Sequence, residues 1–169
     1  VAVNLSIKNL HDLDFPEEVK TLLDKWEIDP RHLVLEITES CIVVDKERVV
    51  NVVKELKEYG INLSIDDFGT GYSSISYLKN FPAREIKIDK SFVIDMVYND
   101  DNSVIVKSTI DMVHNIGCTV VAEGVEDEKT LHLLTELGCD FLQGFHVCRP
   151  LSPDHISDWF RSSSWVKKS

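Results

Sequence analysis

The sequence predicts an α/β fold, a (β/α)8 TIM-type barrel that is N-terminally truncated and retains about six βα units. Two observations carry this prediction. Short apolar, β-branched runs alternate with longer runs of helical periodicity, and a polar residue stands near the end of nearly every short run. A chain of 169 residues is long enough for one domain with a core of its own.

The short runs have the composition of strands, and their starts are separated by 22 to 34 residues. That spacing is typical of βα units and too long for an all-β sandwich. The expected strands are 1–6, 33–39, 61–68, 85–89, 119–125 and 141–145. The stretches between them predict helices over 15–27, 46–59, 103–115 and 126–137, and Ser152-Pro153 is expected to start a last helix.

The placement of polar residues distinguishes a barrel from a doubly wound sheet. A doubly wound sheet binds ligands at one switch point, whereas a barrel uses the ends of many strands. Here each expected strand has a polar residue close to its C-terminal end. In a strand, this residue points to the same face of the sheet as the residue two positions earlier. These polar residues are Asn4, Glu36, Asp66, Lys87, Glu123 and Gln143. We therefore expect a barrel that lacks about two βα units, since eight strands and roughly 250 residues are typical.

Composition and charge exclude several classes of protein. Hydrophobic residues make up 43% and charged residues 28% of the chain, as in ordinary globular domains. The formal net charge of -11 argues against polymeric nucleic acid or an anionic membrane surface as a partner. The four cysteines are far apart in the sequence, which favours free thiols in a reducing compartment such as the cytoplasm. The chain lacks an apolar run of about 18 residues, so we expect a soluble domain. A cytoplasmic domain of this kind could also belong to a membrane-anchored parent. Because the chain opens in mid-strand without an initiator methionine, we expect it to be part of a longer protein.

Asn4, Glu36, Asp66 and Asp67 would form an all-oxygen set if the strand ends met at one barrel mouth. Carboxylate and amide oxygens suit Mg²⁺ or Mn²⁺, and the adjacent Asp66 and Asp67 suit a site with two ions. Lys87 would then orient water or stabilise phosphate charge. Taken one at a time, such carboxylates are more often solvated loop or cap residues, and Lys87 alone could also be an ordinary ion-pair partner.

Six motifs, in order along the chain, resemble those of the EAL family of cyclic di-GMP phosphodiesterases. The matching segments are Val3-Asn4-Leu5-Ser6, Leu35-Glu36-Ile37-Thr38-Glu39, Asp66-Asp67-Phe68-Gly69-Thr70-Gly71-Tyr72-Ser73-Ser74, Ile86-Lys87-Ile88-Asp89, Val121-Ala122-Glu123-Gly124-Val125-Glu126, and Gln143-Gly144-Phe145 with Arg149-Pro150-Leu151. The resemblance implies hydrolysis of cyclic di-GMP to linear pGpG with one or two Mg²⁺ or Mn²⁺ ions, in bacterial second-messenger signalling. It also implies a homodimer, and it is compatible with an upstream diguanylate-cyclase or sensory domain in the parent.

The resemblance also assigns roles to residues. Asn4, Glu36, Asp66 and Asp67 would be metal ligands, and Lys87 and Glu123 would hold the attacking water. Glu39 would anchor the loop that contains Phe68, Gly69, Thr70 and Gly71, which in the family couples the site to the dimer interface. Glu126, Gln143 and Asp89 would complete the surroundings of metal and substrate.

One departure from the family pattern is that the Glu-Ala-Leu motif itself, which supplies a further metal ligand, is not in this chain. We therefore expect residues 1–161 to be a partial EAL domain, followed by a polar tail over 162–169. Two alternatives to an active enzyme stay open: a catalytically inactive cyclic di-GMP receptor or interaction module, and an inactive truncated fragment that associates with another copy through its open sheet edges.

Overall fold

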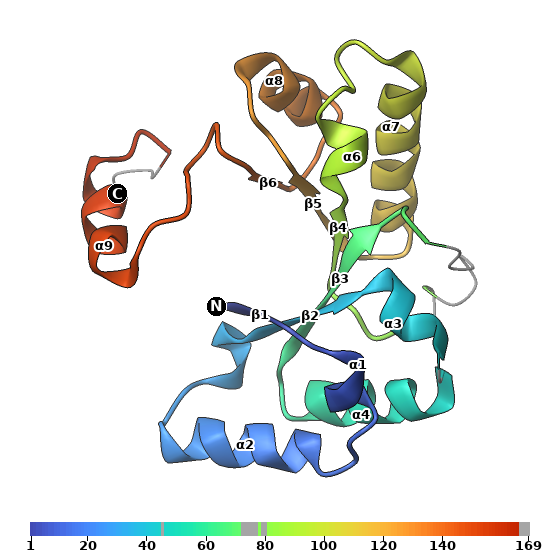
Figure 1. The fold of residues 1–169 in the computed structure, drawn as a ribbon, viewed down its shortest axis with the longest axis vertical. Coiled ribbons are helices and arrows are strands. Elements are labelled where there is room, and N and C mark those ends of the chain that lie inside the picture. Colours follow the sequence, from blue (N-terminus) through green and yellow to red (C-terminus); the bar gives the residue numbers. More distant parts are fainter. Residues whose placement is uncertain (45, 72–77, 79–80, 166–169) are drawn as a thin grey trace.

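A computed structural model describes residues 1–169 apart from 45, 72–77, 79–80 and 166–169, and gives the backbone alone for 42–44 and 46–47. Among the described residues, six parallel strands form one sheet in the order β1-β2-β3-β4-β5-β6 (Figure 1). They are β1 (Ala2–Asn4), β2 (Val34–Thr38), β3 (Asn62–Phe68), β4 (Glu85–Ile88), β5 (Thr119–Glu123) and β6 (Phe141–Gln143). The six strands predicted from the sequence are therefore confirmed.

The strand order decides between the two α/β architectures. Each strand pairs in parallel with the next one along the chain, without the reversal of direction that defines a doubly wound sheet. Figure 1 shows helices α2, α4, α7 and α8 around the outside of this curved sheet. The arrangement is a partial (β/α)8 barrel, as the sequence predicts.

The described helices are α1 (Ile7–Leu10), α2 (Phe15–Lys25), α3 (Glu39–Val44), α4 (Lys46–Glu58), α6 (Lys90–Val93), α7 (Asp100–Asn115), α8 (Glu128–Glu136) and α9 (Pro153–Ser162), with a 3-10 helix at Pro30–His32. The long helices match the sequence prediction. Helix α7 begins at Asp100, three residues earlier than predicted, because the Asn99 side chain accepts hydrogen bonds from the backbone N–H groups of Asp101 and Asn102.

The core lies between the outer face of the sheet and the helices. Alternate strand residues point outward and are buried, which leaves the residues between them on the barrel interior. The outward set is Leu35, Ile37, Leu63, Ile65, Ile86, Ile88, Val120 and Ala122. Helices α4 and α7 cover it with Val49, Val52, Val53, Leu56, Val106, Ile110 and Val113. This packing fixes the parity of each strand, and so decides which polar residues face inward.

Apolar side chains are exposed at both edges of the sheet. Val3 on β1 is 46% exposed and Phe141 on β6 is 55% exposed. Helix α9 contains no buried residue and stands apart from the sheet (Figure 1). The polar tail predicted for 162–169 begins in the last residue of α9, and from residue 166 onward it lies outside the described residues.

The N-terminal ends of β5 and β6 are tied together by one carboxylate. Asp140 Oδ2 accepts a hydrogen bond of 2.8 Å from the Val120 backbone N–H and lies 2.8 Å from His114 Nε2. Burial alone would raise the pKa of Asp140, but the bonds from Val120 and His114 outweigh it and hold that pKa below its ordinary value. Asp140 is therefore a well-satisfied anion at the end of the sheet opposite to the predicted site.

In the part of the chain that the structure describes, no helix combines the length and the apolar character required to cross a bilayer.

Candidate active site

Lys87 is the centre of a charged cluster at the carboxyl ends of the strands. Its Nζ lies 2.7 Å from Glu123 Oε1, 3.0 Å from Asp66 Oδ1 and 3.2 Å from Glu36 Oε1. The Lys87 side chain is 5% exposed, and the carboxylate side chains are 13 to 17% exposed. Strands β2, β3, β4 and β5 thus each supply one charged group to the same point, as expected for the mouth of a barrel.

A β-bulge in β3 brings two consecutive aspartates to this point. Ile65 pairs with Ile86 and Phe68 pairs with Ile88, so that Asp66 and Asp67 on β3 stand opposite the single residue Lys87 on β4. In a regular strand, adjacent side chains would point to opposite faces. Asp67 instead adopts a left-handed backbone conformation with φ of 54°, which aspartate tolerates better than most residues.

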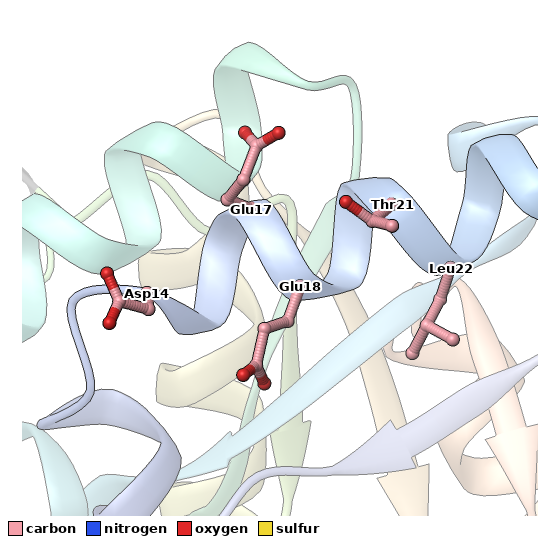
Figure 2. A pocket seen from close by; sticks show the side chains of 5 residues that line it. All are labelled: Asp14, Glu17, Glu18, Thr21 and Leu22. Atoms are coloured by element: carbon pink, nitrogen blue, oxygen red, sulfur yellow. The ribbon is translucent and has the colours of Figure 1, made fainter.

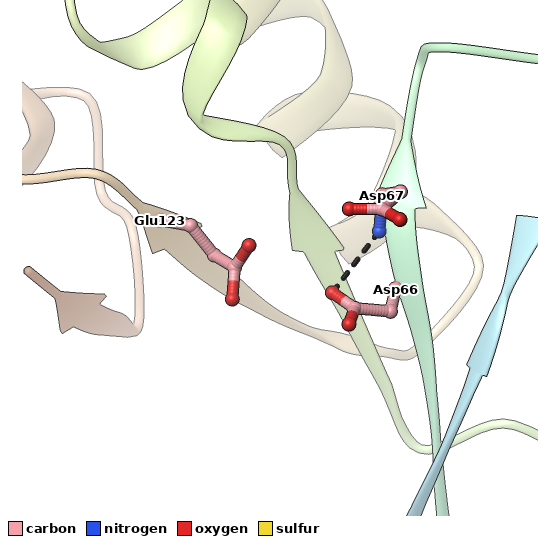
Figure 3. Close-up of side chains that lie close together, drawn as sticks. All are labelled: Asp66, Asp67 and Glu123. Carbon is pink, nitrogen blue, oxygen red and sulfur yellow. Dashed lines mark hydrogen bonds between the residues drawn. The ribbon is translucent and has the colours of Figure 1, made fainter. Parts of the chain in front are cut away.

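The bulge places Asp67 on the same side as Asp66. Asp66, Asp67 and Glu123 each offer an oxygen, and these atoms all lie within 4.8 Å of one another. Figure 3 shows the side chains of Asp66 and Glu123 pointing toward each other across β4, and the hydrogen bond of 3.0 Å that Asp66 Oδ1 accepts from the Asp67 backbone N–H. Burial, together with the neighbouring carboxylates of Asp66 and Asp89, raises the pKa of Asp67. The cluster therefore concentrates negative charge.

The pKa values of Lys87 and Glu123 are both raised in this environment. Burial alone would lower the pKa of Lys87, but hydrogen bonds to Glu123 and Asp66 outweigh it and raise that pKa well above its ordinary value. Burial raises the pKa of Glu123, and the hydrogen bond from Lys87 offsets only part of that rise. The lysine is therefore a fixed cation, whereas the carboxylates around it carry more negative charge than one ammonium group can neutralise.

Glu39 holds the loop that follows the bulge. It is 3% exposed, and its Oε2 accepts hydrogen bonds from the backbone N–H groups of Gly69 at 2.9 Å and Gly71 at 3.2 Å. Thr70 turns back onto the same loop, where its Oγ1 donates a 2.9 Å hydrogen bond to the Asp67 carbonyl. Tyr72, Ser73 and Ser74 of the predicted motif lie outside the described residues.

The other predicted site residues lie around this cluster, some in direct contact with it and others further away. Gln143 Nε2 donates a 3.3 Å hydrogen bond to Glu123 Oε1, and Asp89 lies beside Asp67 at the end of β4. Asn4 is paired in register with Glu36 at the end of β1 and is exposed. Glu126 lies beyond the end of β5, in the wall of a cavity.

Comparison with known proteins agrees with this geometry. The sequence model of the EAL domain matches residues 1–150. The chain belongs to the EAL domain family. It is 41% identical over 159 residues to the signaling protein YkoW of Bacillus subtilis, covering 94% of this chain and 20% of YkoW. It is 38% identical over 156 residues to the bifunctional diguanylate cyclase/cyclic di-GMP phosphodiesterase MucR of Pseudomonas aeruginosa, covering 92% of this chain and 23% of MucR.

Solved EAL domains have the same fold as this chain. The structure of the MucR phosphodiesterase in complex with c-di-GMP superposes with a TM-score of 0.87 at 39% identity, covering 91% of this chain and 62% of that structure. A manganese/cy-diGMP complex of BlrP1 from Klebsiella pneumoniae gives a TM-score of 0.82 at 34% identity, covering 88% of this chain and 38% of that one. The chain spans about a fifth of the length of the curated relatives described above.

A cavity of about 390 Å³ opens beside Glu123 in this EAL domain. It contains the predicted residues Gln143 and Glu126, and also two cations, Lys90 and Arg149, that were not assigned a role from the sequence. The Arg149 guanidinium lies 5.0 Å from the centre of the Phe145 ring, which also lines the cavity. The Arg-Pro-Leu segment that ends the family pattern was the signal that could have identified Arg149.

A second hollow, of about 580 Å³, lies along α2 (Figure 2). Its lining residues Asp14, Glu17, Glu18, Thr21 and Leu22 belong to α2 or its N-cap. Side chains from one helix do not converge on a ligand as those of the strand ends do. The charged mouth of the barrel is therefore the better candidate for an active site.

Proposed function

We propose that the protein containing this EAL domain hydrolyses cyclic di-GMP to linear pGpG in bacterial second-messenger signalling. The observation that carries the proposal is the cluster of Glu36, Asp66, Asp67 and Glu123 around Lys87 at the barrel mouth. The names of MucR and of its c-di-GMP complex support this choice of substrate and reaction.

The residues of the cluster fit a divalent cation. The pKa of Asp67 is raised by burial and by nearby carboxylates, as expected where a positive ion would relieve the crowding. The donor set is all oxygen, which suits Mg²⁺ or Mn²⁺, and the manganese complex of BlrP1 supports the same class of ion. We propose that Asn4, Glu36, Asp66 and Asp67 hold one or two ions. When bound, a divalent ion polarises the phosphodiester and makes water a stronger nucleophile at neutral pH.

Lys87 and Glu123 are proposed to hold the attacking water. Glu123 Oε1 accepts hydrogen bonds from both Lys87 and Gln143, so its carboxylate is fixed in orientation from two sides. The Lys87 ammonium group is a permanent donor at the centre of the site, because its pKa is raised. Hydrolysis of one phosphodiester by this water opens the cyclic dinucleotide and leaves the second phosphodiester intact.

The cavity beside Glu123 supports binding of part of the substrate. Lys90 and Arg149 supply positive charge there, although the chain as a whole carries a net charge of -11. Gln143 and Glu126 offer hydrogen-bonding groups in the same wall, and the Phe145 ring offers an apolar face. We propose that these residues contact the dinucleotide, while Glu39, Asp89 and the loop 68–71 keep the metal-binding aspartates in place.

We further propose an oligomeric state, an upstream domain and a location for the protein. We infer a homodimer, which the exposed apolar side chains of Ile94, Tyr98, Val104 and Ile105 in the α6–α7 region support. An upstream diguanylate-cyclase domain is supported by the bifunctional name of MucR. The four cysteines are free thiols, which supports a cytoplasmic location for the domain. We propose that residues 1–161 form a partial EAL domain and that residues 162–169 form a polar tail.

The test compares two proteins: this chain, and the same chain continued upstream through the Glu-Ala-Leu strand of its parent, here called the extended protein. Each is incubated with cyclic di-GMP and Mn²⁺, and the products are separated to detect pGpG. Asp66→Ala in the extended protein removes a proposed ligand. Asp24→Ala, which removes an exposed carboxylate on α2, is the matched control.

We expect the extended protein and its Asp24→Ala variant to form pGpG, and Asp66→Ala to lose activity by on the order of 10³-fold. We expect this chain alone to be silent. If the extended protein binds cyclic di-GMP but never cleaves it, the enzyme proposal is wrong and a receptor function replaces it.

A further inference from the structure

Helix α6 is a single turn that lies between two loops of the proposed active site. It starts directly after β4, where the Asp89 side chain accepts a hydrogen bond of 2.9 Å from the Ser91 backbone N–H. Val93 at its end is completely buried. The helix therefore has a fixed origin close to Lys87 and a buried anchor.

Phe92 on α6 rests against the loop that follows the β3 bulge. A Cβ atom on Gly69 would lie 2.8 Å from Phe92 Cε2 and 3.4 Å from Cζ, closer than side chains normally approach. Gly69 also has φ of 101°, which residues with a side chain rarely adopt. The ring is thus in direct contact with the loop backbone two residues beyond Asp67.

The opposite side of α6 is blocked by the loop after β5. A Cβ atom on Gly124 would lie 2.6 Å from Lys90 Cβ and 3.2 Å from Lys90 Cα. Gly124 directly follows Glu123. Since α6 meets the backbone on this side as well, it cannot retreat from Gly69 without moving the Glu123 loop, and the Phe92 ring acts as a rigid stop.

The Gly69 turn is held from two directions. Glu39 Oε2 accepts hydrogen bonds from the Gly69 and Gly71 N–H groups, and the Phe92 ring packs on Gly69. The aromatic ring supplies the steric limit that a hydrogen bond lacks.

We propose that Phe92 is a positioning residue, which keeps Asp67 in the left-handed conformation of the bulge and thereby sets the affinity of the site for its divalent cation. The inference rests on the proposed function, because it concerns the same metal-binding aspartates. Phe92 acts through Gly69 and not through contact with substrate. The Phe92 ring fills the space beside Gly69, so the turn that follows Asp67 cannot shift toward α6.

The experiment uses Phe92→Leu in the extended protein, with Phe15→Leu as matched control. Phe15 is also half-buried and packs against the core, but it lies at the start of α2. Two quantities are measured: the Mn²⁺ dissociation constant by electron paramagnetic resonance titration, and hydrogen exchange of the 65–71 segment in metal-free protein. We expect Phe92→Leu to weaken Mn²⁺ binding about 10-fold and to speed exchange of the segment, and Phe15→Leu to change neither.

A second variant pair tests the contact itself. Gly69→Ala is expected to weaken Mn²⁺ binding more in the unmodified background than in Phe92→Leu, since a leucine side chain can turn away from the added methyl group. A general loss of stability would not produce this coupling. Phe92→Leu with an unchanged dissociation constant and unchanged exchange would overturn the inference.

The two proposals fail in different ways. If the unmodified extended protein takes up no Mn²⁺, the proposed function is contradicted. Exchange of the 65–71 segment in metal-free protein still decides whether Phe92 holds the loop.

Discussion

The two ends of the sheet treat their carboxylates in opposite ways. At the carboxyl ends of the strands, Glu36, Asp66 and Glu123 share the ammonium group of Lys87, and the pKa of Glu123 is raised because the group is buried. At the amino ends, Asp140 alone is hydrogen-bonded to the Val120 N–H and to His114. Its pKa is lowered by these bonds, although burial opposes the shift. The carboxylate at the amino ends is fully paired, whereas the carboxylates at the carboxyl ends outnumber their one cation.

This difference separates stability from function within one sheet. A barrel places its chemistry at the carboxyl ends of the strands, while the amino ends contribute mainly to stability. Charge crowding without a bound ion works against folding, so it is retained only where the charges have another task. Four predictions, from the largest expected effect to the smallest, test this contrast.

Asp67→Asn should separate activity from stability. Asparagine also tolerates the left-handed backbone, so the bulge is kept while one anionic oxygen ligand is lost. We expect the rate of pGpG formation by the extended protein to fall on the order of 10²-fold or more, and the free energy of unfolding in EDTA to rise. Asp95→Asn, at an exposed position, is the control. A variant that loses stability together with activity would remove the distinction between the two ends.

Lys87→Met should destabilise the metal-free extended protein by about 3 kcal/mol, because it leaves buried carboxylates without their cation. Urea denaturation in EDTA measures this loss. We expect added Mn²⁺ to stabilise the variant more than the unmodified protein, since the ion would replace the missing positive charge. An equal response of the two proteins to Mn²⁺ would contradict the expectation that the ion takes over the charge of Lys87.

Asp140→Asn should cost about 1 kcal/mol of unfolding free energy, because the charge-assisted hydrogen bonds to Val120 and His114 are weakened. The same loss is expected with Mn²⁺ and with EDTA, and pGpG formation should not change. A dependence of this loss on Mn²⁺ would show that the two ends are coupled.

The smallest effect is a difference in the pH dependence of stability. Asp67 and Glu123 have pKa values in the folded state above their ordinary values of 3.8 and 4.5, so these two groups bind more protons in the folded protein than in the unfolded chain. Their contribution to stability is therefore lost as the pH rises through the folded pKa values. Asp140 has the opposite sign, and its contribution is lost only as the pH falls through its lowered pKa, below the ordinary value of 3.8.

Urea denaturation of the metal-free extended protein at pH 5, 6 and 7 checks this sign. We expect the unfolding free energy to decrease with rising pH, and the Asp67→Asn variant to show a flatter profile. The Asp140→Asn variant should keep the original slope over this range. If the slope changed in Asp140→Asn and not in Asp67→Asn, the amino ends of the strands would determine the pH dependence of stability.

Most strands and helices could be predicted from the periodicity of apolar residues in the sequence, but the shortest helices could not. Strands and helices long enough to show an alternating or a helical pattern were predicted close to their observed bounds. Helices α1, α3 and α6 contain four to six residues and show too little of a period to be recognised. Helix α6 is also the element from which Phe92 reaches Gly69, so this part of the site was not foreseeable from the pattern.

The gathering of Glu36, Asp66, Lys87 and Glu123 was predictable because strand parity places them on one face. Parity fails for Asp67, which would point away from Asp66 in a regular strand. The bulge that turns it inward depends on pairing with β4, more than fifteen residues further on, and no local signal encodes such pairing. The cavity cations Lys90 and Arg149 were missed for a similar reason, because Lys90 lies on the short helix α6 and Arg149 lies in the segment between β6 and α9.

The strictly sequential strand order has a consequence for synthesis on the ribosome. Because each strand docks beside the one made just before it, the sheet can grow from its N-terminal side as the chain emerges. Glu36 and Asp66 are delivered first, then Lys87 with β4, and only afterwards Glu123 with β5. Lys87 therefore reaches the site before Glu123 does, so the last carboxylate of the cluster joins a site that already contains its ammonium partner.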